Sequence, residues 1–113
     1  MRSALDQILG RRSSQQDTMA EGFAHLTDDR SAPLLVVIDG MGGHEGGVVA
    51  ATLAIGAFMQ AASQGGQCDY ESLLDRALHA ANRAIGEHAR QFPSLSGMGC
   101  TLVAAVLDGH RLH

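Results

Sequence analysis

The sequence contains no lysine and no tryptophan, and it has only two cysteines and two prolines. Because lysine is absent, the chain cannot carry the phosphate-binding loop G-x-x-x-x-G-K-[ST]. The cysteines, Cys68 and Cys100, are too few for a disulfide framework, and nothing pairs them at the spacing of a metal site. We therefore expect two reduced thiols and a cytoplasmic location.

The chain also lacks an excess of positive charge. It has 8 basic residues against 12 acidic ones, and its formal net charge is -4. A nucleic-acid-binding surface needs a basic patch, so we expect no nucleic-acid partner. The apolar stretch 48–62 is shorter than the roughly 20 residues that span a bilayer. We expect it to form a buried helix, and we expect no membrane partner.

What is present suits one globular domain or part of one, with 113 residues and 45% hydrophobic content. Residues 34–38 are all apolar and rich in β-branched types, which is typical of a strand covered on both faces. A weaker alternation at residues 18–25 favours an earlier strand. Residues 100–107, "CTLVAAVL", predict another buried strand, and Asp108-Gly109 predicts a hairpin turn into a returning strand.

Two helices are predicted between these strands. The first begins near Gly46, and its apolar face consists of Val48, Ala51, Thr52, Ile55, Met59 and Ala62. The second covers residues 70–91, and its apolar face consists of Leu74, Ala77, Leu78, Ala81 and Ile85. The short loop 63–69 favours antiparallel packing of the two helices. The predicted order is strand, strand, helix, helix, strand, hairpin.

The most unusual stretch is "VVIDGMGGHEGG", residues 36–47, in which five glycines follow Asp39. A carboxylate at the end of a buried strand is held rigidly and can point into a cleft. Glycines let the backbone approach an ion or a phosphate, and the following helix offers unpaired N–H groups to an anion. The same glycines also suit a tight turn from strand to helix. Both interpretations stay open on these residues alone.

Three motifs in this order resemble the metal-dependent Ser/Thr protein phosphatases, the PPM or type 2C family, in their bacterial form. "VVIDGMGGHEGG" is similar to the family signature. "RRSSQQD", residues 11–17, resembles the segment R-x-x-N-[QE]-D, and "GMGCTLVAAVLDGHRLH", residues 97–113, resembles the G-M-G-[TC]-T-L-V strand with its hairpin. The motifs cover nearly the whole chain.

The resemblance implies an α+β fold: a four-layer αββα sandwich of two antiparallel β-sheets flanked by antiparallel helix pairs. It also implies hydrolysis of phosphoserine and phosphothreonine in proteins by a water that bridges two Mn²⁺ or Mg²⁺ ions, without a phosphoenzyme. Asp39 matches the bridging carboxylate, and Gly40 matches a residue that binds one ion through its carbonyl. Both roles suit cations that prefer oxygen ligands.

Further site residues follow from the same resemblance. Arg12 matches the arginine that clamps the substrate phosphate, although Arg11 competes for this role. Asp17 matches an acidic residue near the metal-bound waters. His44 is a candidate general acid, but the family places its proposed acid directly after the Asp-Gly, where this chain has Met41. We expect His44 to be a helix-start residue or to lie just outside the metal ligands.

The family's later aspartates have no counterpart in residues 1–113. The resemblance covers about the first half of the catalytic domain, so we expect residues 1–113 to be its N-terminal portion. We also expect this portion to be inactive alone and prone to self-association. The alternative is a truncated, non-catalytic module that binds phosphoproteins or another partner. A third interpretation is an α/β domain in which the family pattern is accidental.

Overall fold

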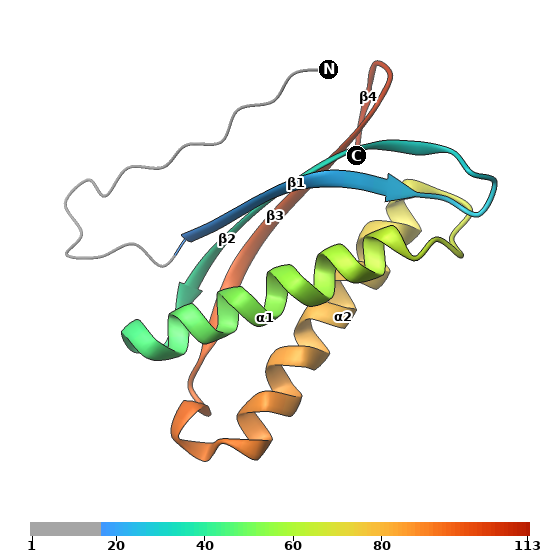
Figure 1. Ribbon diagram of the computed structural model, residues 1–113. Coiled ribbons are helices and arrows are strands. Elements are labelled where there is room, and N and C mark those ends of the chain that lie inside the picture. The colour runs from blue at the N-terminus through green and yellow to red at the C-terminus, as the bar shows by residue number, and fades with distance from the viewer. Residues whose placement is uncertain (1–16) are drawn as a thin grey trace.

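The computed structural model describes residues 17–113, apart from the side chains of Asp17 and His44. The elements follow the predicted order of strand, strand, helix, helix, strand and hairpin (Figure 1). Their bounds are β1 Asp17–His25, β2 Ser31–Met41, α1 Gly43–Ser63, α2 Tyr70–Gln91, a 3-10 turn η1 Pro93–Leu95, β3 Gly99–Asp108 and β4 Arg111–Leu112. The weak first strand is therefore confirmed, and α2 has the predicted bounds.

The four strands form one antiparallel sheet in the order β1-β2-β3-β4. Strands β2 and β3 lie side by side although both helices separate them in the sequence. The predicted hairpin is confirmed, because Asp108 pairs with Arg111 and Gly109 takes a φ of 59° in the turn. The structure thus confirms an α+β fold with one antiparallel sheet and two helices.

Both helices lie on the same side of the sheet (Figure 1). Alternate residues of β2 face the helices, and Leu34, Val36 and Ile38 are each 0% exposed there. Helix α1 contributes Phe58 and helix α2 contributes Leu73 to the same hydrophobic core. We call this helix-covered side the inner face and the opposite side the outer face.

The predicted apolar face of α1 is partly wrong. Ala51 and Ala62 are buried as expected, but Val48 is 44% exposed and Thr52 is also exposed. The Thr52 hydroxyl donates a hydrogen bond to the Val48 carbonyl, 2.8 Å away. The buried stripe is instead made mostly of small residues: Ala50, Ala51, Ala54, Phe58 and Ala62. Small side chains let α1 approach the sheet and α2 closely, and this contact decides which side is buried.

In α2, the predicted positions Ala77 and Ala81 are buried, whereas Leu78 is 48% exposed. Leu73, which was not predicted to face the core, is only 2% exposed. The reason is that α2 packs mainly against α1 and contacts the sheet little. The buried face of α2 is consequently centred on α1.

Within residues 17–113 the central strands are covered on one face only, so their coverage on both faces stays a prediction. On the outer face, Val37 is 44% exposed and Val103 is 71% exposed. Cross-strand partners share a face, so the register assigns most exposed large apolar side chains of the described part to this face. They are Phe23, Val37, Met41, Val103, Leu107 and Leu112.

Helix α1 extends beyond the predicted stretch 48–62 at both ends. By length and composition alone, Glu45–Ser63 is long and apolar enough to cross a membrane. In the structure this helix packs against β1, β2 and α2. Its contacts are those of a core helix, as predicted.

Candidate functional site

Asp39 and Gly40 lie at the carboxyl end of β2, next to the start of α1. Asp39 is half-buried on the outer face of the sheet. The register pairs it with Asp17 of β1 on one side and with Thr101 of β3 on the other. The pairing therefore brings two of the acidic residues that the resemblance selected to directly opposite positions on neighbouring strands.

Gly40 lies on the inner face and is buried. A Cβ atom at this position would overlap the carbonyl oxygen of Gly47 in the first turns of α1. The main chains of β2 and α1 thus touch where a side chain would otherwise stand. Any larger residue at position 40 would push α1 away from the strand end, so this position requires glycine.

Gly42 and Gly43 form the turn from β2 into α1. Their φ angles are 111° and 78°, in the left-handed region that favours glycine. Gly42 is the N-cap of α1 and has no side chain to bond the first-turn N–H groups. The structure therefore confirms the tight strand-to-helix turn. It also leaves the amino end of α1 beside Asp39 without a side-chain cap, and such an end suits an anion.

The remaining predicted site residues are only partly described. Arg12 lies outside the described residues. The backbone of Asp17 begins β1, and His44 lies in the first turn of α1, as expected for a helix-start residue. Their roles stay predictions.

The ligands for a divalent metal ion are incomplete in the described part of the chain. The Asp39 carboxylate and the Gly40 carbonyl are oxygen donors of the kind that Mn²⁺ and Mg²⁺ prefer. However, the described side chains, which do not include those of Asp17 and His44, contain no group of three or more His, Cys, Asp or Glu residues that could hold a metal ion. The donors at the end of β2 therefore fit part of a metal site.

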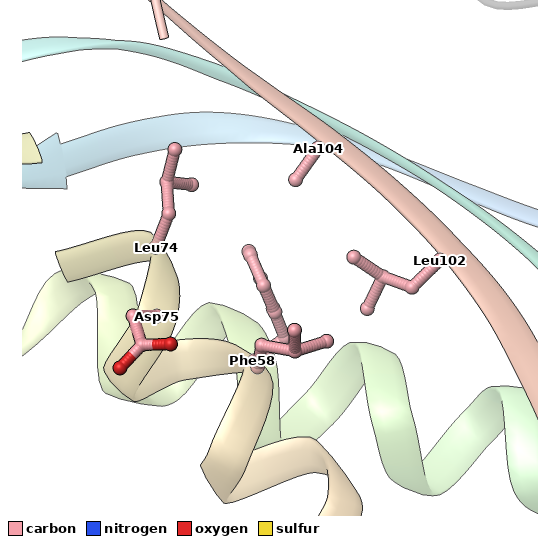
Figure 2. Close-up of a pocket in the computed structure, with 6 residues that line it drawn as sticks. Phe58, Leu74, Asp75, Leu102 and Ala104 are labelled. Atoms are coloured by element: carbon pink, nitrogen blue, oxygen red, sulfur yellow. The ribbon is translucent and has the colours of Figure 1, made fainter. Parts of the chain in front are cut away.

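A separate apolar groove lies between the helices and β3, and the sequence analysis did not predict it. The larger of its two cavities has a volume of about 340 Å³. Figure 2 shows the residues that line it: Phe58, Leu74, Asp75, Leu78, Leu102 and Ala104. Asp75 carries the only charged group among them. An adjoining cavity of about 250 Å³ shares Leu78 and Leu102 and reaches Met98 and Cys100. In the sequence, the wide apolar side of α2 was the feature that could have predicted this groove. The groove is lined mainly by apolar side chains, with Asp75 and Asn82 among its few polar ones.

Cys100 lies across the strands from Gly40, close to the proposed metal donors. Both cysteines are free thiols, as predicted. Burial raises the pKa of the Cys100 thiol, so this group stays protonated near neutral pH. Cys100 is therefore poorly suited to act as a nucleophile or a metal ligand.

Comparison with known proteins supports the family resemblance. The family described as Protein phosphatase 2C matches residues 9–113. The serine/threonine protein phosphatase PstP of Mycobacterium tuberculosis is 42% identical over 81 residues, which cover 72% of this chain and 16% of PstP. The serine/threonine phosphatase stp of Listeria innocua is 34% identical over 79 residues, which cover 66% of this chain and 31% of stp.

The fold is also shared with a solved relative. The crystal structure of the catalytic domain of PstP, in complex with two manganese ions, matches 89% of this chain with a TM-score of 0.70 and 36% identity. The match covers 40% of that domain, and the chain spans less than a third of each curated relative named above. The family match, the sequence identity and the shared fold together establish that this chain belongs to the protein phosphatase 2C family.

Proposed function

We propose that this chain supplies part of the active site of a metal-dependent Ser/Thr protein phosphatase. The observation that carries the proposal is the position of Asp39-Gly40. The pair lies near the carboxyl end of the central strand β2, close in the chain to the uncapped start of α1, and it falls within the family match over residues 9–113. The substrates would be proteins that carry phosphoserine or phosphothreonine, and the location would be cytoplasmic.

Within this proposal, Asp39 and Gly40 would hold the Mn²⁺ or Mg²⁺ ions, Asp39 through a carboxylate shared by two ions and Gly40 through its carbonyl. The bound ions would acidify a water so that it can attack phosphorus at neutral pH. Arg12 holds the phosphate oxygens through its guanidinium group. Asp17, whose backbone pairs with Asp39 in the register, would contact the waters of the metal site. His44 stands outside the metal ligands at the start of α1.

The role of Asp39 is mainly electrostatic and geometric. A carboxylate on a strand is more rigidly held than one on a loop, and its negative charge offsets part of the charge of two cations. The contact between Gly40 and Gly47 sets how close α1 comes to this carboxylate. The uncapped N–H groups of α1 add a positive potential at the same end of β2.

We further propose that residues 1–113 form the N-terminal portion of a four-layer αββα sandwich. The support is the outer face of the sheet, where Phe23, Val37 and Val103 are strongly exposed. Two antiparallel sheets that pack face to face bury such apolar residues between them. A second sheet against the outer face would complete the two middle layers.

Because the described residues supply few metal ligands, we propose that residues 1–113 are inactive alone. The same observation favours a second candidate function, a non-catalytic module that binds phosphoproteins. The two differ in a simple assay. The module would bind a phosphothreonine peptide equally well with and without a chelator, whereas the partial phosphatase site would need Mn²⁺.

A chimera would test the catalytic proposal directly. Residues 9–113 would replace the matching segment in the catalytic domain of mycobacterial PstP, and the hydrolysis of a phosphothreonine peptide would be followed with Mn²⁺. We expect Mn²⁺-dependent turnover, and we expect Asp39→Asn to reduce kcat/KM at least about 100-fold because it removes a bridging charge. Arg12→Ala should mainly raise KM.

Two results would contradict the proposal. Full activity of the Asp39→Asn chimera would show that this carboxylate is not a metal ligand. Mn²⁺-dependent turnover by the isolated 113 residues, lost in Asp39→Asn, would contradict the proposed inactivity of the chain alone. A Glu21→Gln chimera is the matched control, because Glu21 is an exposed acidic residue on the same face of β1, away from the strand end.

A further inference from the structure

We propose that Met98 is a positioning residue for the Asp39-Gly40 site. Its Cα and Cβ atoms abut the first turns of α1, and its buried side chain lines the cavity between α2 and β3. Met98 thereby anchors the main chain against which the amino end of α1 rests. The inference rests on the proposed function only where it concerns metal binding. The packing that it describes is independent of that function.

Met98 is a large, buried side chain in a part of the molecule rich in glycine. Its neighbours in the sequence are Gly97 and Gly99, and it faces Gly42 and Gly46. Met98 is only 8% exposed, and its backbone N–H donates a hydrogen bond to the Leu95 carbonyl, 3.0 Å away. Its backbone is therefore held by the turn η1, and its side chain lines the cavity between α2 and β3.

The turn before α1 makes room for the main chain at Met98. A Cβ atom at Gly42 would lie 2.6 Å from the Met98 Cα and 3.0 Å from the Gly97 carbonyl oxygen. One helical turn further on, a Cβ atom at Gly46 would lie 3.4 Å from the Met98 Cβ. Glycine at positions 42 and 46 thus lets α1 and residue 98 approach to direct contact.

Strand pairing connects this contact to the proposed metal ligands. Gly40 pairs with Cys100, and Met41 pairs with Gly99. Met98 comes directly before the Met41–Gly99 pair, at the point where β2 turns into α1. The end of β2, the start of β3 and the first turn of α1 therefore meet at the main chain and Cβ of Met98. The rest of its side chain lines the cavity between α2 and β3. Methionine suits such an irregular space because it is long, unbranched and flexible.

Truncating Met98 should loosen this end of the molecule without unfolding the rest. In the 113-residue chain, we expect Met98→Ala to speed hydrogen exchange of the amides of residues 47–50 at least about tenfold, while α2 stays within about twofold. Those amides close the first hydrogen-bonded turn of α1. Met98→Leu, which keeps nearly the same volume, should restore the slow exchange.

Leu26→Ala is the matched control. Leu26 is 4% exposed, and it lies in the β1–β2 turn, away from the carboxyl end of β2. Its truncation also removes buried apolar volume, so it reports what a general loss of stability does. The positioning role is wrong if Leu26→Ala speeds exchange at residues 47–50 as selectively as Met98→Ala does.

Two glycine variants test the main-chain contact. Gly42 and Gly43 both have positive φ, so alanine at either position carries backbone strain. Only at Gly42 would the new Cβ meet Met98, because nothing lies within 4 Å of a Cβ at Gly43. We expect Gly42→Ala to speed exchange at residues 47–50 more than Gly43→Ala does. Equal effects would mean that strain alone explains the glycine at position 42.

A metal titration adds a readout that general stability would not move. Paramagnetic Mn²⁺ should broaden the amide signals of residues 38–41, and Met98→Ala should need about tenfold more Mn²⁺ than Leu26→Ala for equal broadening. Equal requirements in the two variants would overturn the positioning of the metal donors. If the unsubstituted chain shows no broadening there, the metal-binding part of the proposed function fails, and the exchange experiment alone decides the role of Met98.

Discussion

The two faces of the sheet carry similarly apolar side chains but are packed very differently. On the inner face, Leu34 and Val36 are 0% exposed, whereas on the outer face Val37 is 44% exposed and Val103 is 71% exposed. The two valines at positions 36 and 37 are adjacent in the sequence and differ only in the side to which they point. The comparison teaches that an apolar run indicates a strand but does not say how many layers cover it.

The difference arises from the position of the helices. Both helices cross from β2 back to β3 on one side, and Phe58 and Leu73 fill the space above the inner face. On the outer face, no helix or strand of residues 17–113 covers the sheet. Removal of apolar surface from water contributes about 25 cal/mol per Å², so the inner face supplies most of the stability of this chain.

The largest expected effect is a loss of stability from the inner face. We expect Leu34→Ala to lower the free energy of unfolding by about 2–5 kcal/mol, because it leaves a cavity in the core. Its neighbour Leu35 points to the outer face and is half-buried, so Leu35→Ala should cost less than about 1.5 kcal/mol. Urea unfolding of both variants would measure the difference. Equal losses would show that the outer face is as well packed as the inner one.

A second prediction concerns association through the outer face. We expect the isolated 113-residue chain to self-associate, because exposed apolar sheet faces pack against one another. Val103→Glu should shift it toward monomer and change the dissociation constant at least about tenfold, since it buries a charge in that contact. Sedimentation velocity would measure this shift. Leu78→Glu, at an exposed leucine of α2, is the control and should leave the association unchanged.

The smallest expected loss of stability concerns the start of α2, one of the two helices on the inner face of the sheet. The Ser72 N–H donates a hydrogen bond to the Asp69 carboxylate, 2.7 Å away, and this bond lowers the pKa of Asp69. Asp69→Ala should lower the melting temperature by a few degrees at neutral pH, whereas Asp69→Asn should keep most of the cap.

The pH dependence of this cap has a definite sign. Because the pKa of Asp69 is lowered in the folded state, its stabilising effect is present above its ordinary pKa of about 3.9 and is lost as the pH falls below that value. Melting temperatures measured between pH 7 and about pH 2.5 should therefore converge for the parent chain and Asp69→Ala. A constant gap between the two would contradict this role of the carboxylate.

Local patterns predicted the elements well and the buried faces less well. Helix α2 has the predicted bounds because Asp69 caps it and its apolar period continues to the break at Phe92-Pro93. The face of α1 was misassigned because its sequence is apolar nearly all round, so Val48 and Ala54 were equal candidates for burial. Only contact with the sheet and α2 distinguishes them.

At the site, the glycines around Asp39 predicted a backbone that other chain segments can approach closely. The structure agrees, because Gly40 lets α1 approach β2 and Gly42 lets the main chain at Met98 approach α1. The pairing of Asp17 with Asp39 was not predictable from spacing, because it depends on the register of two strands joined by a turn. The contact of Met98 with Gly42 also escaped the sequence analysis. The motif around Met98 was recognised in the sequence. Its contact partner Gly42, however, lies far away in the chain, in the turn between β2 and α1.

The amino-acid sequence by itself determined the order of the elements, the hairpin at Asp108-Gly109, the absence of a lysine-based phosphate loop and the family resemblance. These depend on residues close together in the chain, whose propensity, periodicity and spacing can be read directly. Tertiary structure alone decided which sheet face is covered, which side of α1 is buried and how Met98 meets the turn before α1. Those outcomes depend on contacts between residues far apart in the sequence, where packing of whole layers outweighs local preference.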